Sequence, residues 1–119
     1  PFHYVKGNND YRVDTPSQKL VRLGGKTLLL THGHKQRVYW NYDTISYWAE
    51  EQGADVVLFG HTHMPLWEAG GRVALFNPGS ISLPRGGTLP TFGILTMEDG
   101  RIEGAIMEYW NKEHFKRIN

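Results

Sequence analysis

The stretch "DVVLFGHTHMP" (residues 55–65) places two histidines, His61 and His63, directly after a short apolar run. The run "DVVLF" (55–59) contains β-branched residues and is followed by Gly60, a pattern that predicts a buried strand ending in a loop. Side-chain direction in an extended chain repeats every two residues, so both rings are expected on one side of the chain. The stretch therefore predicts a pair of imidazoles at the end of a strand.

Two further polar clusters follow predicted strands. "KTLLLTHGH" (26–34) is an apolar run that ends in Thr, His, Gly and His, and "FHYVKGNND" (2–10) is a strand pattern that ends in a turn. A fourth polar cluster is "NPGS" (77–80). Because loops at the carboxyl ends of strands meet in one crevice of an open sheet, we expect these side chains to converge.

The residue types in these clusters favour a metal site. Imidazole nitrogens with an amide or carboxylate oxygen suit Mn, Fe, Co, Ni or Zn, whereas Ca prefers oxygen ligands. The chain has no Cys, so thiolate ligands and disulfides are excluded. A single His after a strand is more often a hydrogen-bonded loop residue, but four histidines in two glycine-flanked motifs favour ligation. His3 and His114 are not interpreted as ligands, and "NPGS" is also compatible with a simple turn.

The remaining segments predict a mixed α/β sandwich. "DTISYWAEEQGA" (43–54) has helical spacing, with Asp43 as the expected N-cap and Gly53 just past the end. Two hairpins are predicted, at 66–80 around Gly70-Gly71 and at 92–110 around Asp99-Gly100, a type I′ turn dipeptide. Residues 11–25 are expected to form a loop that leads to a short pairing strand.

Length and charge limit the classes of protein and partner. The 119 residues suit one domain spanning 1–119, and 13 basic against 12 acidic side chains leave a net charge of +1. No run of Lys or Arg suggests a nucleic-acid stripe, so nucleic acid is not an expected partner. No apolar window approaches a membrane span of about 20 residues. Together with the lack of Cys, this fits a cytoplasmic protein.

The ordered motifs resemble a known family. "GNND", "THGH", "GHTH" and "FNPGS", followed by "LPRGG" (83–87), resemble the calcineurin-like metallophosphoesterases, specifically their small single-domain bacterial and archaeal phosphodiesterase branch. The resemblance implies a four-layer α-β-β-α sandwich of two mixed sheets. It also implies two divalent transition-metal ions, with Mn expected first and Ni, Fe, Co or Zn as alternatives. Asn8, His32 and His61 would bind one metal, and His63 the other.

Two departures from the family pattern affect these expectations. Asn9 stands where relatives often have a catalytic His, so His34 is the nearest candidate for steering the phosphate or protonating the leaving oxygen. The Asp-x-His and Gly-Asp motifs of the family do not precede residue 7, and the chain begins at Pro1 rather than Met. We therefore expect these residues to be the C-terminal two-thirds of a longer protein, with the N-terminal strands missing, and to show little hydrolysis alone.

The function implied by the resemblance is hydrolysis of small phosphodiesters through a metal-bridged hydroxide. The alternative is a catalytically eroded scaffold of the same fold, as in the small sorting subunit of retromer. Erosion normally alters the ligand histidines, whereas the downstream ligand types are intact here, which favours an enzyme. A homodimer or homotetramer is also expected.

Overall fold

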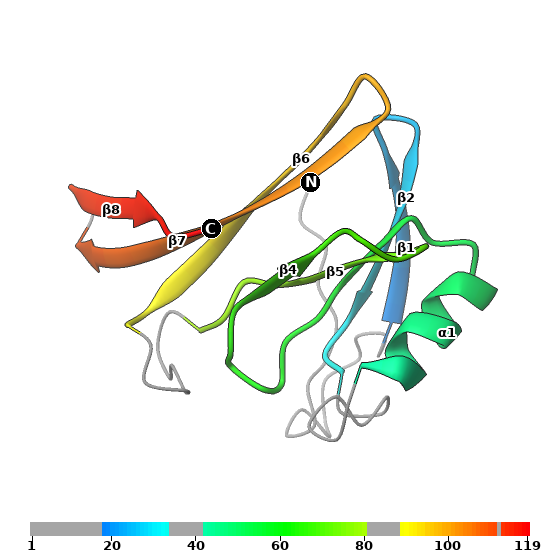
Figure 1. Cartoon of the computed structure of the whole chain (residues 1–119), viewed down its shortest axis with the longest axis horizontal. Helices are drawn as coiled ribbons and strands as arrows, with labels where there is room; N and C mark the ends of the chain where they lie inside the picture. The colour runs from blue at the N-terminus through cyan, green and yellow to red at the C-terminus, as the bar shows by residue number, and fades with distance from the viewer. Residues whose placement is uncertain (1–17, 34–41, 81–88, 112) are drawn as a thin grey trace.

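The computed structural model describes residues 18–33, 42–80, 89–111 and 113–119. Within these ranges one helix and two sheets form three stacked layers, which are three of the four layers implied by the family resemblance (Figure 1). The predicted strand at 2–10, together with Asn8, Asn9, His34 and the "LPRGG" segment, lies outside the described residues. No helix in the described part of the chain is long and apolar enough to cross a membrane.

The first sheet has five strands in the order β1-β2-β3-β5-β4. Its strands are β1 (Gln18–Leu23), β2 (Lys26–Thr31), β3 (Val56–Leu58), β4 (Leu66–Glu68) and β5 (Ala74–Asn77). β2, β3 and β5 run parallel to one another, while β1 and β4 pair antiparallel at the two edges. The sheet is therefore mixed, and the hairpin predicted around Gly70-Gly71 is confirmed as β4 and β5.

A glycine pair also closes the first hairpin. Gly24 and Gly25 have φ angles of 56° and 79°, the left-handed conformation that a two-residue type I′ turn requires. A β-carbon at Gly24 would collide with the backbone carbonyl of Met97, so the turn lies directly against the second sheet. A pairing strand is present, but it is β1, which begins at Gln18 inside the stretch 11–25 that was expected to form a loop, so the loop assignment of these residues was wrong.

Helix α1 (Asp43–Glu51) begins one residue earlier than the sequence suggested. Its N-cap is Tyr42, so the prediction of Asp43 as N-cap was wrong. Asp43 lies instead in the first turn, where its negative charge interacts favourably with the positive end of the helix dipole. The C-terminus follows the prediction. Gly53 (φ 72°) donates to the Glu50 carbonyl and Ala54 donates to the Ala49 carbonyl, both at 3.0 Å, which is a Schellman motif.

Two apolar clusters lie on opposite faces of the first sheet. One packs α1 on the sheet through residues that include Ile45, Ala49 and Val57, all with no exposed surface. The other fills the space between the two sheets and includes Val56, Phe76 and Ile106. Because neighbouring strand residues point to opposite faces, Val56 and Val57 each serve a different cluster. This alternation explains why β3 reads as a continuous apolar run.

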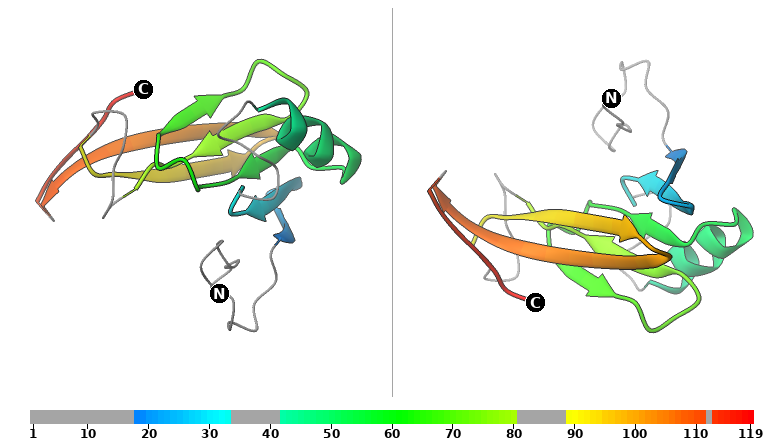
Figure 2. Two further views of the ribbon diagram at one scale, coloured as in Figure 1. Left: turned by 90° about the horizontal axis from the view of Figure 1, so that it is seen from below. Right: turned by 90° about the horizontal axis from the view of Figure 1, so that it is seen from above.

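The second sheet has the order β6-β7-β8, with β6 (Thr91–Glu98), β7 (Arg101–Asn111) and β8 (His114–Arg117). All three strands pair antiparallel, so the mixed character implied for this sheet is not seen among the described residues. Asp99 and Gly100 both have positive φ, which confirms the predicted type I′ turn. Figure 2 shows β6 and β7 stacked alongside β4 and β5 of the first sheet.

The two sheets approach closely where glycines on the second sheet face aromatic rings on the first. A β-carbon at Gly93 would lie 2.6 Å from the Phe76 ring, and one at Gly104 would collide with the Trp67 ring. Trp67 in turn packs edge-on against Phe76, with ring centroids 5.5 Å apart. The glycines thus provide the space that these two rings occupy.

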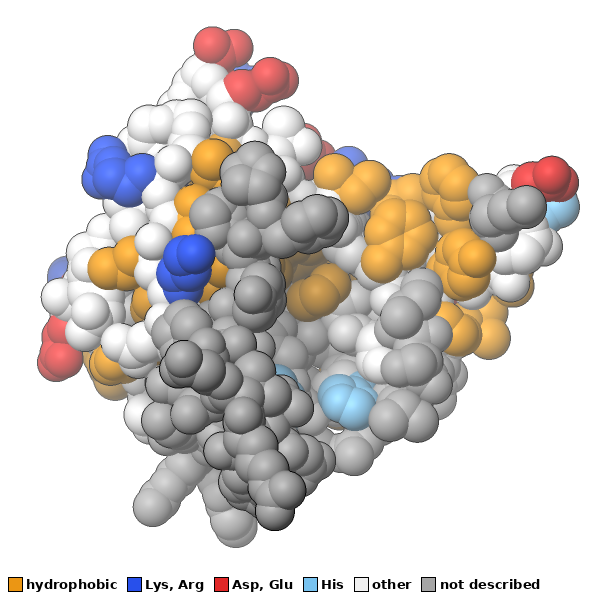
Figure 3. Space-filling model, turned by 180° about the vertical axis from the view of Figure 1, so that it is seen from behind, with side chains coloured by type: hydrophobic (Ala, Val, Ile, Leu, Met, Phe, Trp, Pro, Cys, Tyr) orange, Lys and Arg blue, Asp and Glu red, His pale blue; other side chains and the backbone are white. Residues whose placement is uncertain are grey.

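The opposite face of the second sheet is partly apolar. Phe92 contacts both Tyr109 and Phe115 through their rings, with centroids 6.3 Å and 6.0 Å apart. Ile94 and Phe115 are about half exposed, and hydrophobic side chains gather over β6–β8 in the space-filling view (Figure 3).

Replacing Gly104 by Ala should lower the free energy of unfolding by about 1–3 kcal/mol, because the added methyl group meets the ring of Trp67. Gly70→Ala is the matched control, since no heavy atom lies within 4 Å of a β-carbon there. Its effect should stay within about 0.5 kcal/mol. Urea unfolding of both variants measures this difference, and equal stabilities would contradict the described sheet packing.

Candidate metal centre

Three of the predicted metal ligands lie in loops at the carboxyl ends of two neighbouring parallel strands. His32 directly follows β2, and His61 and His63 follow β3 after Phe59 and Gly60. The Gly60 backbone N–H donates to the His32 carbonyl at 2.9 Å, which holds the two loops side by side. The rings of His32 and His61 lie with their centroids 4.9 Å apart at an interplanar angle of 67°. The predicted convergence of these two histidines is therefore seen.

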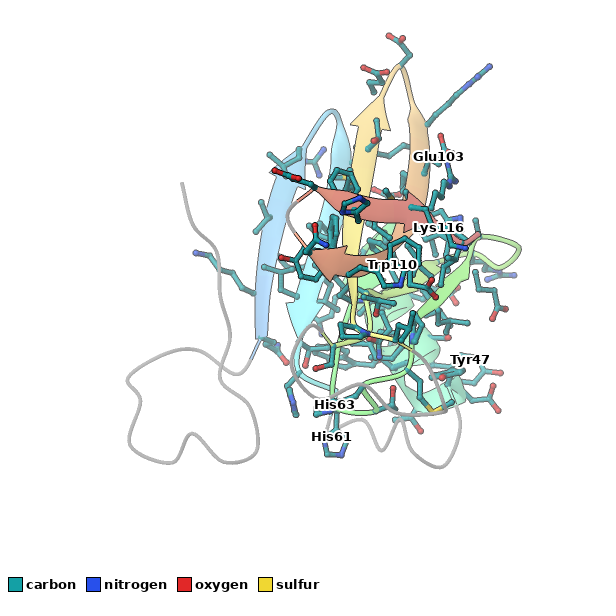
Figure 4. The ribbon with its side chains drawn as sticks, turned by 90° about the vertical axis from the view of Figure 1, so that its left-hand side faces the viewer. Tyr47, His61, His63, Glu103, Trp110 and Lys116 are labelled. Carbon is teal, nitrogen blue, oxygen red and sulfur yellow. The ribbon has the colours of Figure 1, made fainter. Side chains whose placement is uncertain are left out.

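The backbone at the two histidines differs from the expectation. His61 and His63 have φ angles of 67° and 58°, so both adopt the left-handed conformation rather than an extended one. The argument from two-residue strand periodicity was wrong here, because β3 ends at Leu58 and the chain turns before it reaches the histidines. Non-glycine residues in this conformation cost roughly 1–3 kcal/mol each, so other interactions must hold the loop. Figure 4 shows both side chains at the same end of the molecule.

Asn77 supplies several of these interactions. The last residue of β5, it has no exposed surface, and its side-chain amide donates to the Gly60 carbonyl at 3.1 Å and to the Thr62 hydroxyl at 3.0 Å. The Thr62 hydroxyl also accepts a hydrogen bond from the Met64 backbone N–H at 3.2 Å. These bonds span the histidine loop from Gly60 to Met64 and tie it to β5.

The "NPGS" cluster is a turn, as one reading of the sequence allowed, and it carries this further role. Gly79 (φ 79°) donates its backbone N–H to the Asn77 side-chain oxygen at 2.9 Å, which forms an Asx turn. The buried Thr91 hydroxyl donates to the Pro78 carbonyl at 2.7 Å. Asn77 belongs to a cluster that was expected to converge at this crevice, but the sequence assigned it no role of its own. The available signal was a polar amide inside the apolar run "VALFN", directly before Pro-Gly.

The described residues hold part of a ligand set. Across residues 18–33, 42–80, 89–111 and 113–119, no group of three or more His, Asp or Glu side chains is placed to hold a metal ion. His32 and His61 are nevertheless adjacent imidazoles, and two imidazoles suit a divalent transition metal. Asn8 and His34, the other predicted site residues, lie outside the described ranges. The donor chemistry of His32 and His61 therefore fits a transition metal.

A separate groove of about 820 Å³ lies between α1 and the β4–β5 connection, and none of these histidines lines it. Arg72 crosses it to Glu50 with an N–O distance of 2.8 Å. The hydrogen bond and charge of Glu50 raise the pKa of the Arg72 guanidinium. The Arg72 side chain is largely exposed and that of Glu50 is partly exposed, so this ion pair contributes little to stability.

Comparison with known proteins gives a consistent family. The model of the calcineurin-like phosphoesterase superfamily domain matches residues 1–100. The probable metallophosphoesterase YsnB of Bacillus subtilis is 39% identical over 99 residues, covering 83% of this chain and 59% of that protein. The phosphodiesterase YfcE of Escherichia coli is 37% identical over 99 residues, covering 76% of this chain and 50% of that protein.

Solved structures agree in fold. The crystal structure of a predicted phosphoesterase from Streptococcus pneumoniae is similar over 96% of this chain and 68% of its own, with a TM-score of 0.80 and 30% identity. Vps29 from Entamoeba histolytica, solved in complex with Zn²⁺, has a TM-score of 0.80 at 21% identity and covers 98% of this chain and 67% of its own. That identity supports a likeness of fold alone.

The chain spans between one-half and three-fifths of the length of the two curated relatives. The residues matched by the family model include all four motifs, from "GNND" to "FNPGS". With two adjacent histidines at the carboxyl ends of parallel strands and a family model that covers most of its residues, this chain belongs to the calcineurin-like phosphoesterase superfamily.

Proposed function

We propose that this chain is part of a divalent-metal-dependent phosphodiesterase that hydrolyses small phosphodiesters. The single observation that carries the proposal is the pairing of His32 and His61 across the ends of β2 and β3, with ring centroids 4.9 Å apart. The family membership of the chain and its 37% identity to a phosphodiesterase support the reaction class. The near-neutral net charge of +1 supports a small substrate over a nucleic acid.

His32 and His61, with Asn8, would hold one metal, and His63 would contribute to a second, with Mn²⁺ as the expected ion. Bound divalent ions supply Lewis acidity toward phosphate oxygens. The protein's own contribution is to place nitrogen donors before the ion arrives, which lowers the cost of organising the site. The left-handed backbone at His61 and His63 is part of that placement.

His34 remains the proposed residue for steering the phosphate or protonating the leaving oxygen. It follows Gly33, whose φ of 103° lets the chain turn sharply directly after His32. Asn9 has no titrating proton, so it cannot take this role. A substrate with an activated leaving group, such as an aryl phosphodiester, would need little help from an acid.

A scaffold of the same fold is the second candidate, supported by the structural likeness to Vps29. In that case, binding of a protein partner would replace hydrolysis as the function. The 37% identity to a phosphodiesterase, against 21% to Vps29, favours the enzyme. Homo-oligomer formation remains a prediction, and the half-exposed Ile94 and Phe115 on the second sheet support it.

His61→Ala should weaken Mn²⁺ binding by more than about tenfold. Removing a residue that only hydrogen-bonds to a ligand already lowers metal affinity by about that factor, and removing the ligand itself should lower it further. His114→Ala is the matched control, because His114 is exposed and lies on β8, a strand that carries none of the predicted ligands. Isothermal titration calorimetry of both variants gives the comparison. Equal Mn²⁺ affinity in His61→Ala and in the unmodified protein would contradict the assignment of this ligand.

Hydrolysis of bis(p-nitrophenyl) phosphate with added Mn²⁺ should be readily detected for the longest protein that the gene encodes, and should be little or none for residues 1–119. The physical reason is that residues 1–119 contain neither the Asp-x-His nor the Gly-Asp motif, which the family resemblance makes part of the ligand set. Release of p-nitrophenolate measures both rates. A folded, full-length protein with neither bound metal nor turnover would favour the scaffold function instead.

A further inference from the structure

We infer that Asn77 and Thr62 are positioning residues that hold the loop Gly60–Met64 in its metal-binding conformation before any metal is bound. The inference rests on the proposed function, because it assigns His61 and His63 as ligands. Neither Asn77 nor Thr62 is itself a ligand in this assignment. Their contribution passes entirely through the backbone that carries the two histidines.

The first argument is where the hydrogen bonds fall. Asn77 donates to the Gly60 carbonyl, which belongs to the peptide unit directly before His61. The Thr62 hydroxyl accepts from the Met64 N–H, which belongs to the peptide unit directly after His63. A third bond, from the Asn77 amide to the Thr62 hydroxyl, joins these two anchor points at 3.0 Å. The network therefore fixes the backbone on both outer sides of the histidine pair.

The second argument is backbone conformation. His61 and His63 both have left-handed φ angles, which residues other than Gly adopt only where surrounding structure imposes them. The Thr62 N–H bonds to the Gly60 carbonyl at 2.8 Å, so the chain turns tightly around His61. Without the anchors this segment would relax toward ordinary backbone angles, and both rings would turn away from their present positions.

The third argument is burial. Asn77 has no exposed surface and Thr62 is 3% exposed, so water does not replace a hydrogen bond that is lost here. Asn77 is itself held by the Gly79 N–H and by its place at the end of β5. A buried polar network with every group paired is rigid and geometrically specific. The histidine loop is thereby held rigidly against β5 of the first sheet.

Matched threonine substitutions test the inference in the full-length protein. Thr62→Val keeps the shape but removes the acceptor shared by Asn77 and Met64, whereas Thr62→Ser keeps the hydroxyl. Thr27→Val is the control for general destabilisation, because Thr27 is also buried and accepts a hydrogen bond from Arg22, yet lies at the opposite end of β2. The probe is Co²⁺, followed by its visible absorption spectrum and by titration.

We expect Thr62→Val to bind Co²⁺ about 10- to 100-fold more weakly and with an altered absorption spectrum. Thr62→Ser should restore most of the affinity, and Thr27→Val should lose stability without losing affinity. Asn77→Asp, which places a carboxylate oxygen against the Gly60 carbonyl, should behave like Thr62→Val. Unchanged Co²⁺ affinity and spectrum in both Thr62→Val and Asn77→Asp would overturn the inference while leaving the proposed function intact.

A second measurement keeps the inference testable if a variant fails to fold or no metal binds. Hydrogen exchange of the Met64 amide in metal-free Thr62→Ser and in unmodified protein should show strong and similar protection, because both retain the acceptor. Rapid exchange of this amide in the unmodified, metal-free protein would overturn the inference. Absence of Co²⁺ binding by the unmodified protein, with the amide protected, would instead count against the proposed metal function.

Discussion

The parallel alignment of β3 between β2 and β5 is the constraint on which the site depends. Asp55 fixes the amino ends of these strands: its carboxylate accepts from the Thr27 N–H at 2.7 Å, and its backbone bonds to Thr27 and Ala74. At the other end, Gly60 donates to the His32 carbonyl and Phe59 donates to the Phe76 carbonyl. A register fixed at both ends leaves the histidine loops only one relative position.

Much of this arrangement follows from local sequence rules. Gly24-Gly25 and Asp99-Gly100 determine two of the hairpins, because few residues tolerate the left-handed angles of a type I′ turn. The apolar run of β3 indicates a strand buried on both faces, and the structure places Val56 and Val57 in opposite clusters. The two His-containing motifs were correctly placed at strand ends. These features depend on residues close together in the chain.

The features that could not be predicted from the sequence depend on residues that are far apart in the chain. The left-handed angles at His61 and His63 are imposed by Asn77, which lies 15 positions from Thr62, and no local pattern around "GHTH" predicts them. The N-cap of α1 was predicted at Asp43 because Asp is a residue type favoured at N-caps, whereas Tyr42 occupies that position in the structure. The clearance between the sheets depends likewise on Gly104 facing Trp67, a pairing of residues that meet only across the sandwich.

Because its backbone is held by hydrogen bonds from Asn77, the histidine motif cannot be moved to another protein as a short continuous segment. A protein engineer who transplanted only "GHTH" into another loop would transfer the imidazoles without the backbone that presents them. The smallest transferable unit is discontinuous, and comprises residues 60–64 together with the Asn77–Gly79 turn held beside them. Any recipient scaffold would therefore need two directly paired parallel strands with the same register as β3 and β5.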